Sequence, residues 1–384
     1  MTLRLQSQRG PANVCSMATR FCIISLAASA LLFSGTMNAQ TPPPDLRIGI
    51  IGLDTSHAEQ FTMRLNDAAN PNHIPGGRVV AAFPTGSPDL EDSQSRIEGY
   101  TATVRDKYGV KIVGSIQELC AGVDAVMVLS LDGRKHPEQA REVIAMKKPF
   151  FLDKPVAASL KDAVQIFSLA DTVGVPMFSA SAVRWYPGVV EVATAESSPA
   201  ISALSYGPSP VLNGHPDLFF YGIHPTEALF TVMGSGCQSV ARAGGPPDAS
   251  VITGVWDGGR TGTLHALHFL PMESKHYKVV RFGGGQQVIE QKTQGDYTPM
   301  LREILKFFQT KQPPVTAAQT LEIYAFMEAA EESKRRKGAS VALRDVLQKA
   351  DCPEKWLPAK PAAPEREGAK PQEPKPVRAK EKEE

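Results

Sequence analysis

The chain has 384 residues, a formal net charge of +1, and acidic and basic residues interspersed along most of its length. It is long enough to form two domains with hydrophobic cores of their own. The balanced charge and the lack of a basic stripe interleaved with aromatic residues argue against a nucleic-acid-binding protein.

The N-terminus has the layout of a secretory signal peptide. Residues 21–33 form an apolar run of about a dozen residues, shorter than the roughly 20 that a transmembrane helix needs. Arg20 precedes this run, and small residues follow it up to Ala39. We therefore expect residues 1–39 to be a signal peptide and the mature protein to be periplasmic or extracellular, with no membrane span. A buried core helix is the alternative.

Export would leave three cysteines, Cys120, Cys237 and Cys352. Their wide spacing suits neither a disulfide framework nor a metal site, and no pair of histidines has metal-ligand spacing either. We expect no metal, and either one disulfide or buried free thiols.

The first element after the leader is a predicted strand, residues 47–51, which ends at Gly52. A helix is predicted from Ser56, so that the glycine turn and the helix N-terminus form a phosphate-binding corner. The dinucleotide fingerprint places glycine at three positions, which here hold Gly52, Asp54 and His57. The carboxylate of Asp54 would repel a diphosphate unless it turns away, so the fold is indicated more strongly than the cofactor.

Strands and helices then alternate as far as residue 179. This pattern predicts a doubly wound parallel sheet with helices on both faces, the Rossmann arrangement, over residues 46–180. The residues after the second strand, including Thr85 and Ser87, do not decide between NAD and NADP. The further predicted strands are 78–83, 111–113, 123–130, 148–152 and 175–179, and the helices are 98–108, 136–146, 159–173 and one capped by Ser115.

The pattern changes in residues 181–345, the second predicted domain. Strands at 201–206, 251–256, 261–269 and 278–282 suit a largely antiparallel sheet with one face in water, and helices follow at 297–310 and 317–336. From Pro353 to the end the chain is rich in proline, lysine and glutamate, and we expect residues 353–384 to be disordered.

Two stretches carry residues suited to catalysis. Asp153-Lys154-Pro155 follows a predicted strand, where α/β sheets bind ligands, and Lys154 there could lower the pKa of a sugar hydroxyl. His224 is predicted just before a helix N-terminus, with Glu227 one turn further, and histidine is the usual general base near neutral pH. The alternatives are a surface strand end for the lysine and a capping or core residue for the histidine. His57, His136 and His215 are weaker candidates.

Together these stretches resemble the Gfo/Idh/MocA oxidoreductase family, on residues 47–52, 124–136, 148–155 and 222–227. The resemblance implies an N-terminal Rossmann domain and a C-terminal α/β domain with a largely antiparallel open sheet, whose face usually supports homo-oligomer contacts. It also implies NAD or NADP and a small sugar or polyol substrate.

The resemblance also implies site residues. An aspartate that commonly lies four residues before the family's histidine is Phe220 here, so the proton relay is incomplete and Tyr221 is the nearest substitute. The expected catalytic residues are Lys154, His224, Tyr221 and Glu227. The expected cofactor-binding residues are Gly52, Asp54, Thr55, Ser56, His57, Ser130, Leu131, His136, Asp153 and Lys154.

Three functions remain open. The first is a sugar or polyol oxidoreductase that uses NAD or NADP. The second is a non-redox sugar lyase or glycosidase assisted by a tightly held NAD. The third is a carbohydrate-binding protein of the same fold without turnover. An exported enzyme lacks a pool of free cofactor, which adds weight to the second and third functions.

Overall fold

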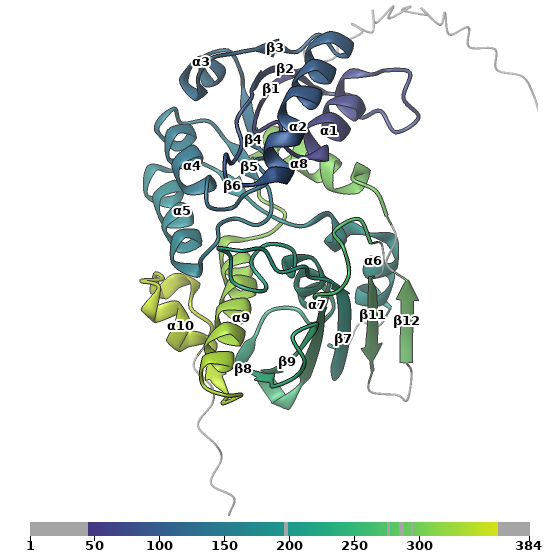
Figure 1. The fold of residues 1–384 in the computed structure, drawn as a ribbon, viewed down its shortest axis with the longest axis vertical. Helices are drawn as coiled ribbons and strands as arrows, with labels where there is room; N and C mark the ends of the chain where they lie inside the picture. Colours follow the sequence, from purple (N-terminus) through teal and green to yellow (C-terminus); the bar gives the residue numbers. More distant parts are fainter. Residues whose placement is uncertain (1–44, 196–198, 275–276, 284–287, 293–294, 360–384) are drawn as a thin grey trace, which may run out of the picture. The chain divides into compact units, whose positions relative to one another are not determined.

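The computed structural model describes residues 45–359, except 196–198, 275–276, 284–287 and 293–294 (Figure 1). The expected signal peptide and residues 360–384 of the expected tail lie outside the described residues. Within the described part, no helix has both the length and the hydropathy needed to span a membrane.

The first sheet has six parallel strands in the order β3-β2-β1-β4-β5-β6. This order confirms the predicted doubly wound fold. Its strands are apolar and largely buried because helices cover both faces. The order reverses between β1 and β4, which places a ligand crevice at their carboxyl ends. The strands are β1 Leu46–Ile51, β2 Gly77–Phe83, β3 Lys111–Ile112, β4 Ala125–Val128, β5 Phe150–Leu152 and β6 Met177–Phe178.

Side-chain caps start three of the helices around this sheet. The hydroxyls of Thr55, Ser115 and Ser159 accept hydrogen bonds from backbone N–H groups in the first turns of α1, α3 and α5. The helix predicted at 98–108 begins earlier and ends in a π-helical turn, 103–107. The helices are α1 Ser56–Asn66, α2 Glu91–Ala102, α3 Ile116–Ala121, α4 His136–Ala145 and α5 Leu160–Val173.

A helix from much later in the chain completes the core of the first sheet. α8, Thr298–Thr310, has an apolar face that is buried with β1 and α1. Leu305 of this helix lies so close to Gly77 that a Cβ at Gly77 would be 2.5 Å from it. The first core therefore includes a helix that follows the second sheet in sequence.

The second sheet has seven strands in the order β12-β11-β7-β10-β9-β8-β13. All neighbours are antiparallel except β7 and β10, so the expectation of a largely antiparallel sheet is confirmed. β8, β12 and β13 were not predicted. The strands are β7 Ser202–Pro208, β8 Cys237–Ala243, β9 Ala249–Trp256, β10 Thr261–Leu267, β11 Lys278–Phe282, β12 Val288–Lys292 and β13 Val341–Ala342.

Helices cover one face of the second sheet. α7, Ile223–Met233, packs on β7 and β10, and α9, Ala317–Arg335, packs on β8 (Figure 1). α6, Pro187–Thr194, lies against α7, and α10, Leu343–Lys349, lies against α9. The opposite face exposes apolar side chains, among them Val251 and Val255 of β9.

Two expectations about the remaining chain are settled. Disorder from Pro353 onward is wrong for residues 353–359, because Trp356 packs against Phe167 of α5, with ring centroids 6.5 Å apart. Cys120, Cys237 and Cys352 are buried free thiols, so they form no disulfide.

Candidate functional site

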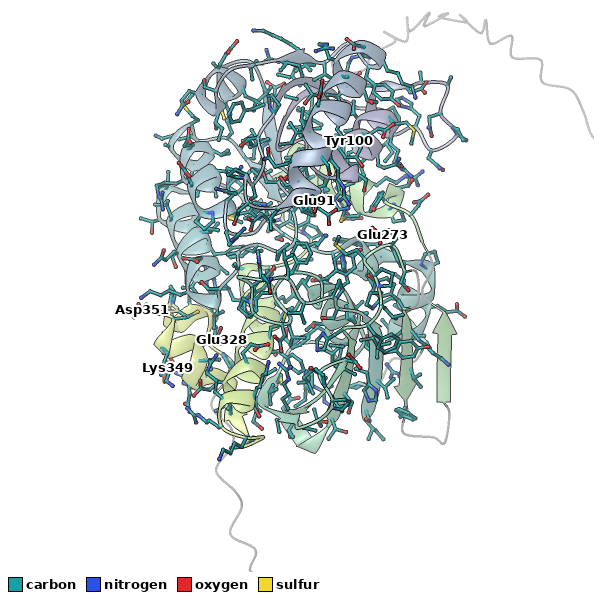
Figure 2. All side chains as sticks on the ribbon, in the orientation of Figure 1. Glu91, Tyr100, Glu273, Glu328, Lys349 and Asp351 are labelled. Carbon is teal, nitrogen blue, oxygen red and sulfur yellow. The ribbon has the colours of Figure 1, made fainter. Side chains whose placement is uncertain are left out.

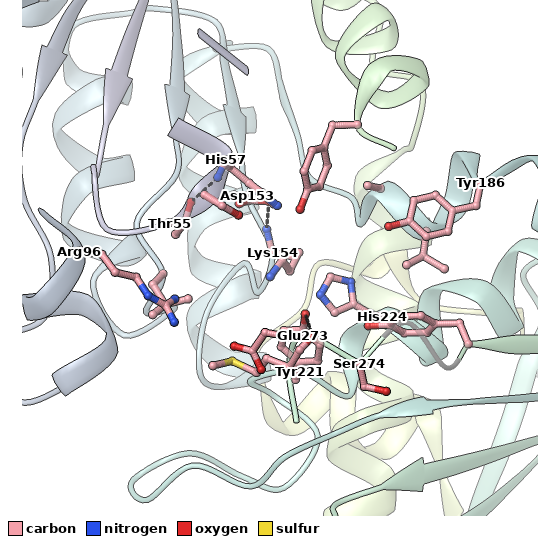
Figure 3. A pocket seen from close by; sticks show the side chains of 17 residues that line it. Thr55, His57, Arg96, Asp153, Lys154, Tyr186, Tyr221, His224, Glu273 and Ser274 are labelled. Carbon is pink, nitrogen blue, oxygen red and sulfur yellow. Dashed lines mark hydrogen bonds and ion pairs between the residues drawn. The ribbon is translucent and has the colours of Figure 1, made fainter. Parts of the chain in front are cut away.

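A cavity of about 270 Å³ lies at the carboxyl ends of β1, β4 and β5 (Figure 3). It extends from the start of α1 to the start of α7, so residues from both sheet regions form its walls. Of the predicted site residues, the cavity brings together Thr55, Ser56, His57, Leu131, Asp153, Lys154, Tyr221 and His224. Gly52, Asp54, Ser130, His136 and Glu227 lie outside its walls.

The turn between β1 and α1 packs tightly against the end of β4. Gly52 has φ +90°, and a Cβ there would lie 2.4 Å from the backbone nitrogen of Ser130, so this position requires glycine. Asp54 is fully buried: its Oδ1 accepts from Leu131 N at 3.0 Å and its Oδ2 from Ser93 Oγ at 2.7 Å. The carboxylate therefore turns away from the cavity. Burial raises the pKa of Asp54, and the hydrogen bonds from Ser93 and Leu131 oppose that rise.

His57 and Asp153 form a buried pair. His57 Nδ1 lies 2.5 Å from Asp153 Oδ2, and Lys154 N donates to Asp153 Oδ1 at 2.8 Å. Burial alone would raise the pKa of Asp153, but the charge and hydrogen bond of His57, together with Lys154, hold it below its usual value. The His57 ring stacks on Phe61, with centroids 4.9 Å apart. His57 is thus held rigidly at the cavity wall.

Lys154 places its ammonium group inside the cavity. Its Nζ lies 5.2 Å from the centroid of the Tyr221 ring, within cation–π range. Burial lowers the pKa of Lys154, and the negative charge of Asp153 opposes that shift. A partly desolvated ammonium of this kind is a strong hydrogen-bond donor to a substrate oxygen.

His224 lies in the first turn of α7, not before the helix as predicted. Its Nδ1 is 2.6 Å from Ser181 Oγ, so Nε2 is the ring nitrogen left for a substrate. Burial and the positive charges of Lys154 and His57 lower the pKa of His224 well below its usual value. The imidazole is therefore neutral near pH 7 and able to accept a proton.

Tyr221 contacts His224 edge-on, with ring centroids 4.5 Å apart. Its hydroxyl donates to the Met272 carbonyl at 2.7 Å, and burial raises its pKa to about 12. The phenol is therefore protonated, and its proton is already donated to a backbone carbonyl. Tyr221 thus lines the cavity but does not replace the missing aspartate in the proton relay.

Three other predicted residues support the site from outside the cavity. Glu227 is buried, accepts from Arg184 Nε at 2.5 Å and does not line the cavity, and the catalytic role expected for it stays a prediction. His136 is fully buried with Nδ1 at Pro155 O and Nε2 at Ser130 O, and it ties the loop after β4 to the loop after β5. Ser130 Oγ accepts from Gln139. These contacts position the backbone of the two loops, and the cofactor-binding roles expected for His136 and Ser130 stay predictions.

Sequence patterns did not indicate several wall residues. Arg96 lies on α2, and Tyr297 precedes α8, far from any recognised motif. Glu273 lies on the loop before β11 and is labelled in Figures 2 and 3. Tyr186 and Tyr277 complete the aromatic lining. None of the five follows a fixed spacing from another site residue, so no sequence signal marks them.

A buried network beside the cavity joins three loops. Asp132 is fully buried and accepts from Ser87 Oγ at 2.6 Å and from Arg134 Nη2 at 2.7 Å. His215 Nε2 lies 3.0 Å from Asp132 Oδ1. Burial opposes ionisation, but the hydrogen bonds from His215, Arg134 and Ser87 hold the pKa of Asp132 far below its usual value. The network therefore ties the loops after β2 and β4 to the loop before α7.

The cavity fits the reactive end of a nicotinamide dinucleotide. Because Asp54 turns away, Thr55 and Ser56 face the cavity at the first turn of α1, where the helix dipole favours an anion. Lys154 and His224 line the same cavity, where the hydroxyl of a substrate would meet them. A volume of about 270 Å³ is slightly below the roughly 300–1,000 Å³ of sites for drug-sized ligands.

Comparisons with known proteins agree with this fold. Residues 46–181 match the GFO_IDH_MocA family, described as an oxidoreductase family with an NAD-binding Rossmann fold. An inositol 2-dehydrogenase from Cereibacter sphaeroides is 31% identical over 144 residues, which is 37% of this chain and 37% of that protein. The chain thus matches just over a third of the length of that relative.

Solved structures show the same fold across most of the chain. An oxidoreductase from Agrobacterium radiobacter, in complex with NAD+, L-tartaric acid and magnesium, has a TM-score of 0.62 at 16% identity, covering 79% of this chain and 100% of that one. Myo-inositol dehydrogenase from Lactobacillus casei, in complex with NAD(H) and myo-inositol, has a TM-score of 0.61 at 17% identity, covering 78% and 97%.

Proposed function

We propose that the chain is an NAD(P)-dependent oxidoreductase acting on a hydroxyl of a sugar or polyol, starting from the match of residues 46–181 to the Gfo/Idh/MocA oxidoreductase family. The observation that carries the proposal is the meeting of Lys154 and His224 in one cavity at the carboxyl end of β5. The inositol dehydrogenases among its relatives support a polyhydroxylated substrate.

The roles of the two residues follow from their surroundings. The ammonium of Lys154 donates to the substrate oxygen and stabilises the negative charge that develops on it. The neutral imidazole of His224, with Nδ1 at Ser181 Oγ, accepts the hydroxyl proton at Nε2. The low pKa of His224 makes it a weak base, so the proton transfer depends on Lys154 lowering the pKa of the hydroxyl. When bound, the nicotinamide supplies the acceptor for the hydride.

Purified protein tests this proposal directly. Each of NAD+ and NADP+ would be mixed with myo-inositol and with a panel of aldoses and polyols, and the appearance of the reduced cofactor followed by absorbance. We expect turnover with at least one polyhydroxylated substrate. Failure of both dinucleotides to bind, measured by calorimetry, would exclude the proposal.

We also propose that the protein is exported to the periplasm or the exterior of the cell. The support is the apolar run and the small residues before Ala39. Cell fractionation followed by N-terminal sequencing tests it: the mature chain should begin near Gln40, and an intact chain found only in the cytoplasm would refute export.

We propose further that the exposed face of the second sheet forms a homo-oligomer contact. Val255 is 40% exposed and sits on the face that no described helix covers, beside Thr261 on β10. Val255→Glu would bury a charge in such a contact, which is costly. We expect the mass measured by light scattering to fall from oligomer to monomer.

A matched control is available on α5. Val173 is also 40% exposed but lies away from this sheet. Val173→Glu should leave the mass unchanged. A wild-type protein that is already monomeric would contradict the proposed contact.

A further inference from the structure

One end of the cavity combines an α-helix N-terminus with two side chains that the glycine fingerprint does not include. Thr55 caps α1, Ser56 and His57 begin it, and Arg96 reaches the cavity from α2. Thr55, His57 and Arg96 are labelled in Figure 3. In the usual fingerprint, glycines let the backbone approach a diphosphate. Here Asp54 and His57 replace two of those glycines.

α2 compensates for Asp54 in two ways. Ser93 and Arg96 are three residues apart, which places them on the same side of the helix. Ser93 Oγ holds Asp54 Oδ2 at 2.7 Å, away from the cavity, while the guanidinium of Arg96 lines the cavity. α2 thus keeps the carboxylate of Asp54 turned away from the phosphate-binding corner, and it also adds the positive charge of Arg96 to the cavity wall.

His57 offers the second group. Its side chain is only 9% exposed, and Nδ1 is taken by Asp153. Among the described residues, Nε2 has no hydrogen-bond partner although the ring lines the cavity. Because the ring lines the cavity, Nε2 is within reach of a ligand bound there.

The carboxylates nearby do not cancel this positive end. Asp153 is paired with His57, and Asp92 is paired with Arg96 on the solvent side at 2.9 Å. Glu273 is the remaining carboxylate on the cavity wall. Lys154 adds a further cation.

We propose that His57 and Arg96 clamp a phosphate group of the cofactor, in place of the glycine backbone of the usual turn. The inference rests on the proposed function, because it takes the anion to be the diphosphate of NAD(H) or NADP(H). The chemistry alone would equally accept free pyrophosphate, which allows the clamp to be tested apart from the enzyme reaction.

Calorimetric titration of the full chain with NADH and with inorganic pyrophosphate tests the clamp. Arg96→Gln should weaken the affinity for NADH and for pyrophosphate by about tenfold or more, because one charge-assisted hydrogen bond is lost. It should also flatten the salt dependence of binding, because a cation that faces the anion is gone. Arg105→Gln is the matched control: Arg105 is an exposed arginine in the π-helical turn that follows α2, paired with Asp106 outside the cavity, and its loss should change neither affinity.

His57→Gln is the second variant, with thermal unfolding as a check on folding. If it folds, it should weaken both ligands as Arg96→Gln does. Unchanged binding of NADH by Arg96→Gln would overturn the clamp and leave the proposed function standing. Arg96-dependent binding of pyrophosphate without any binding of NADH would support the clamp and overturn the proposed function. If the wild type binds neither NADH nor pyrophosphate, the clamp and the proposed function are both overturned.

Discussion

Replacing Lys154 by methionine is expected to lower kcat/KM by about a thousandfold. The substitution removes the ammonium group that donates to the substrate oxygen beside His224. His224 alone, with its depressed pKa, is too weak a base to deprotonate an ordinary hydroxyl. Steady-state kinetics on the substrate identified by the turnover panel measures the effect.

Stability should not fall in the same variant. The pKa of Lys154 is lowered by burial, so keeping it charged costs folding free energy at neutral pH, and the cost is relieved as pH rises toward the unfolded value. Methionine removes that cost, and we expect an equal or higher Tm. Lys148→Met is the control, because Lys148 Nζ donates to Val123 O away from the cavity. Wild-type activity in Lys154→Met would remove the lysine from the mechanism.

Replacing Asp132 by asparagine is expected to lower the free energy of unfolding by about 3 kcal/mol. The amide cannot accept all the hydrogen bonds from Ser87, Arg134 and His215 that the carboxylate accepts. Urea unfolding at pH 7 measures the loss.

The pH dependence supplies a check. The pKa of Asp132 is below its usual value of about 3.9, so the carboxylate stabilises the fold above that pH and loses this effect as pH falls. The difference in the free energy of unfolding between the wild type and Asp132→Asn should therefore become smaller as the pH is lowered. Asp89→Asn is the control: Asp89 pairs with the same Arg134 but its side chain is 57% exposed, and its loss should cost under about 1 kcal/mol. Equal losses in the two variants would refute the network's importance.

Much of the first sheet was predictable because its strands are apolar runs buried on both faces. β1 and β4 lie within one or two residues of the predicted core of each run. β8 and the start of α2 were missed for the opposite reason. Cys237–Ala243 mixes polar and apolar residues, and α2 begins with polar residues and buries only Ser93. Packing against neighbouring elements stabilises such strands and helices, and their own sequence pattern does not reveal them.

The site residues also fall into those that a local motif predicts and those that depend on distant packing. Lys154 and His224 were predicted because each follows a local motif at a strand or helix end. The orientation of Asp54 was not predictable, because it depends on Ser93 from another helix, 39 residues later. Arg96 and Tyr297 reach the cavity only through the packing of α2 and α8, which no local pattern specifies.

The packing of α8 against the first sheet limits how this chain can be divided. A fragment ending near residue 181 would lack Leu305, Phe307 and Phe308, all buried in the first core, and would leave their apolar contact surface in water. During synthesis, that core stays open until residues 298–310 have been made. The segment that matches the family ends at residue 181, whereas the core it belongs to includes a helix more than a hundred residues downstream.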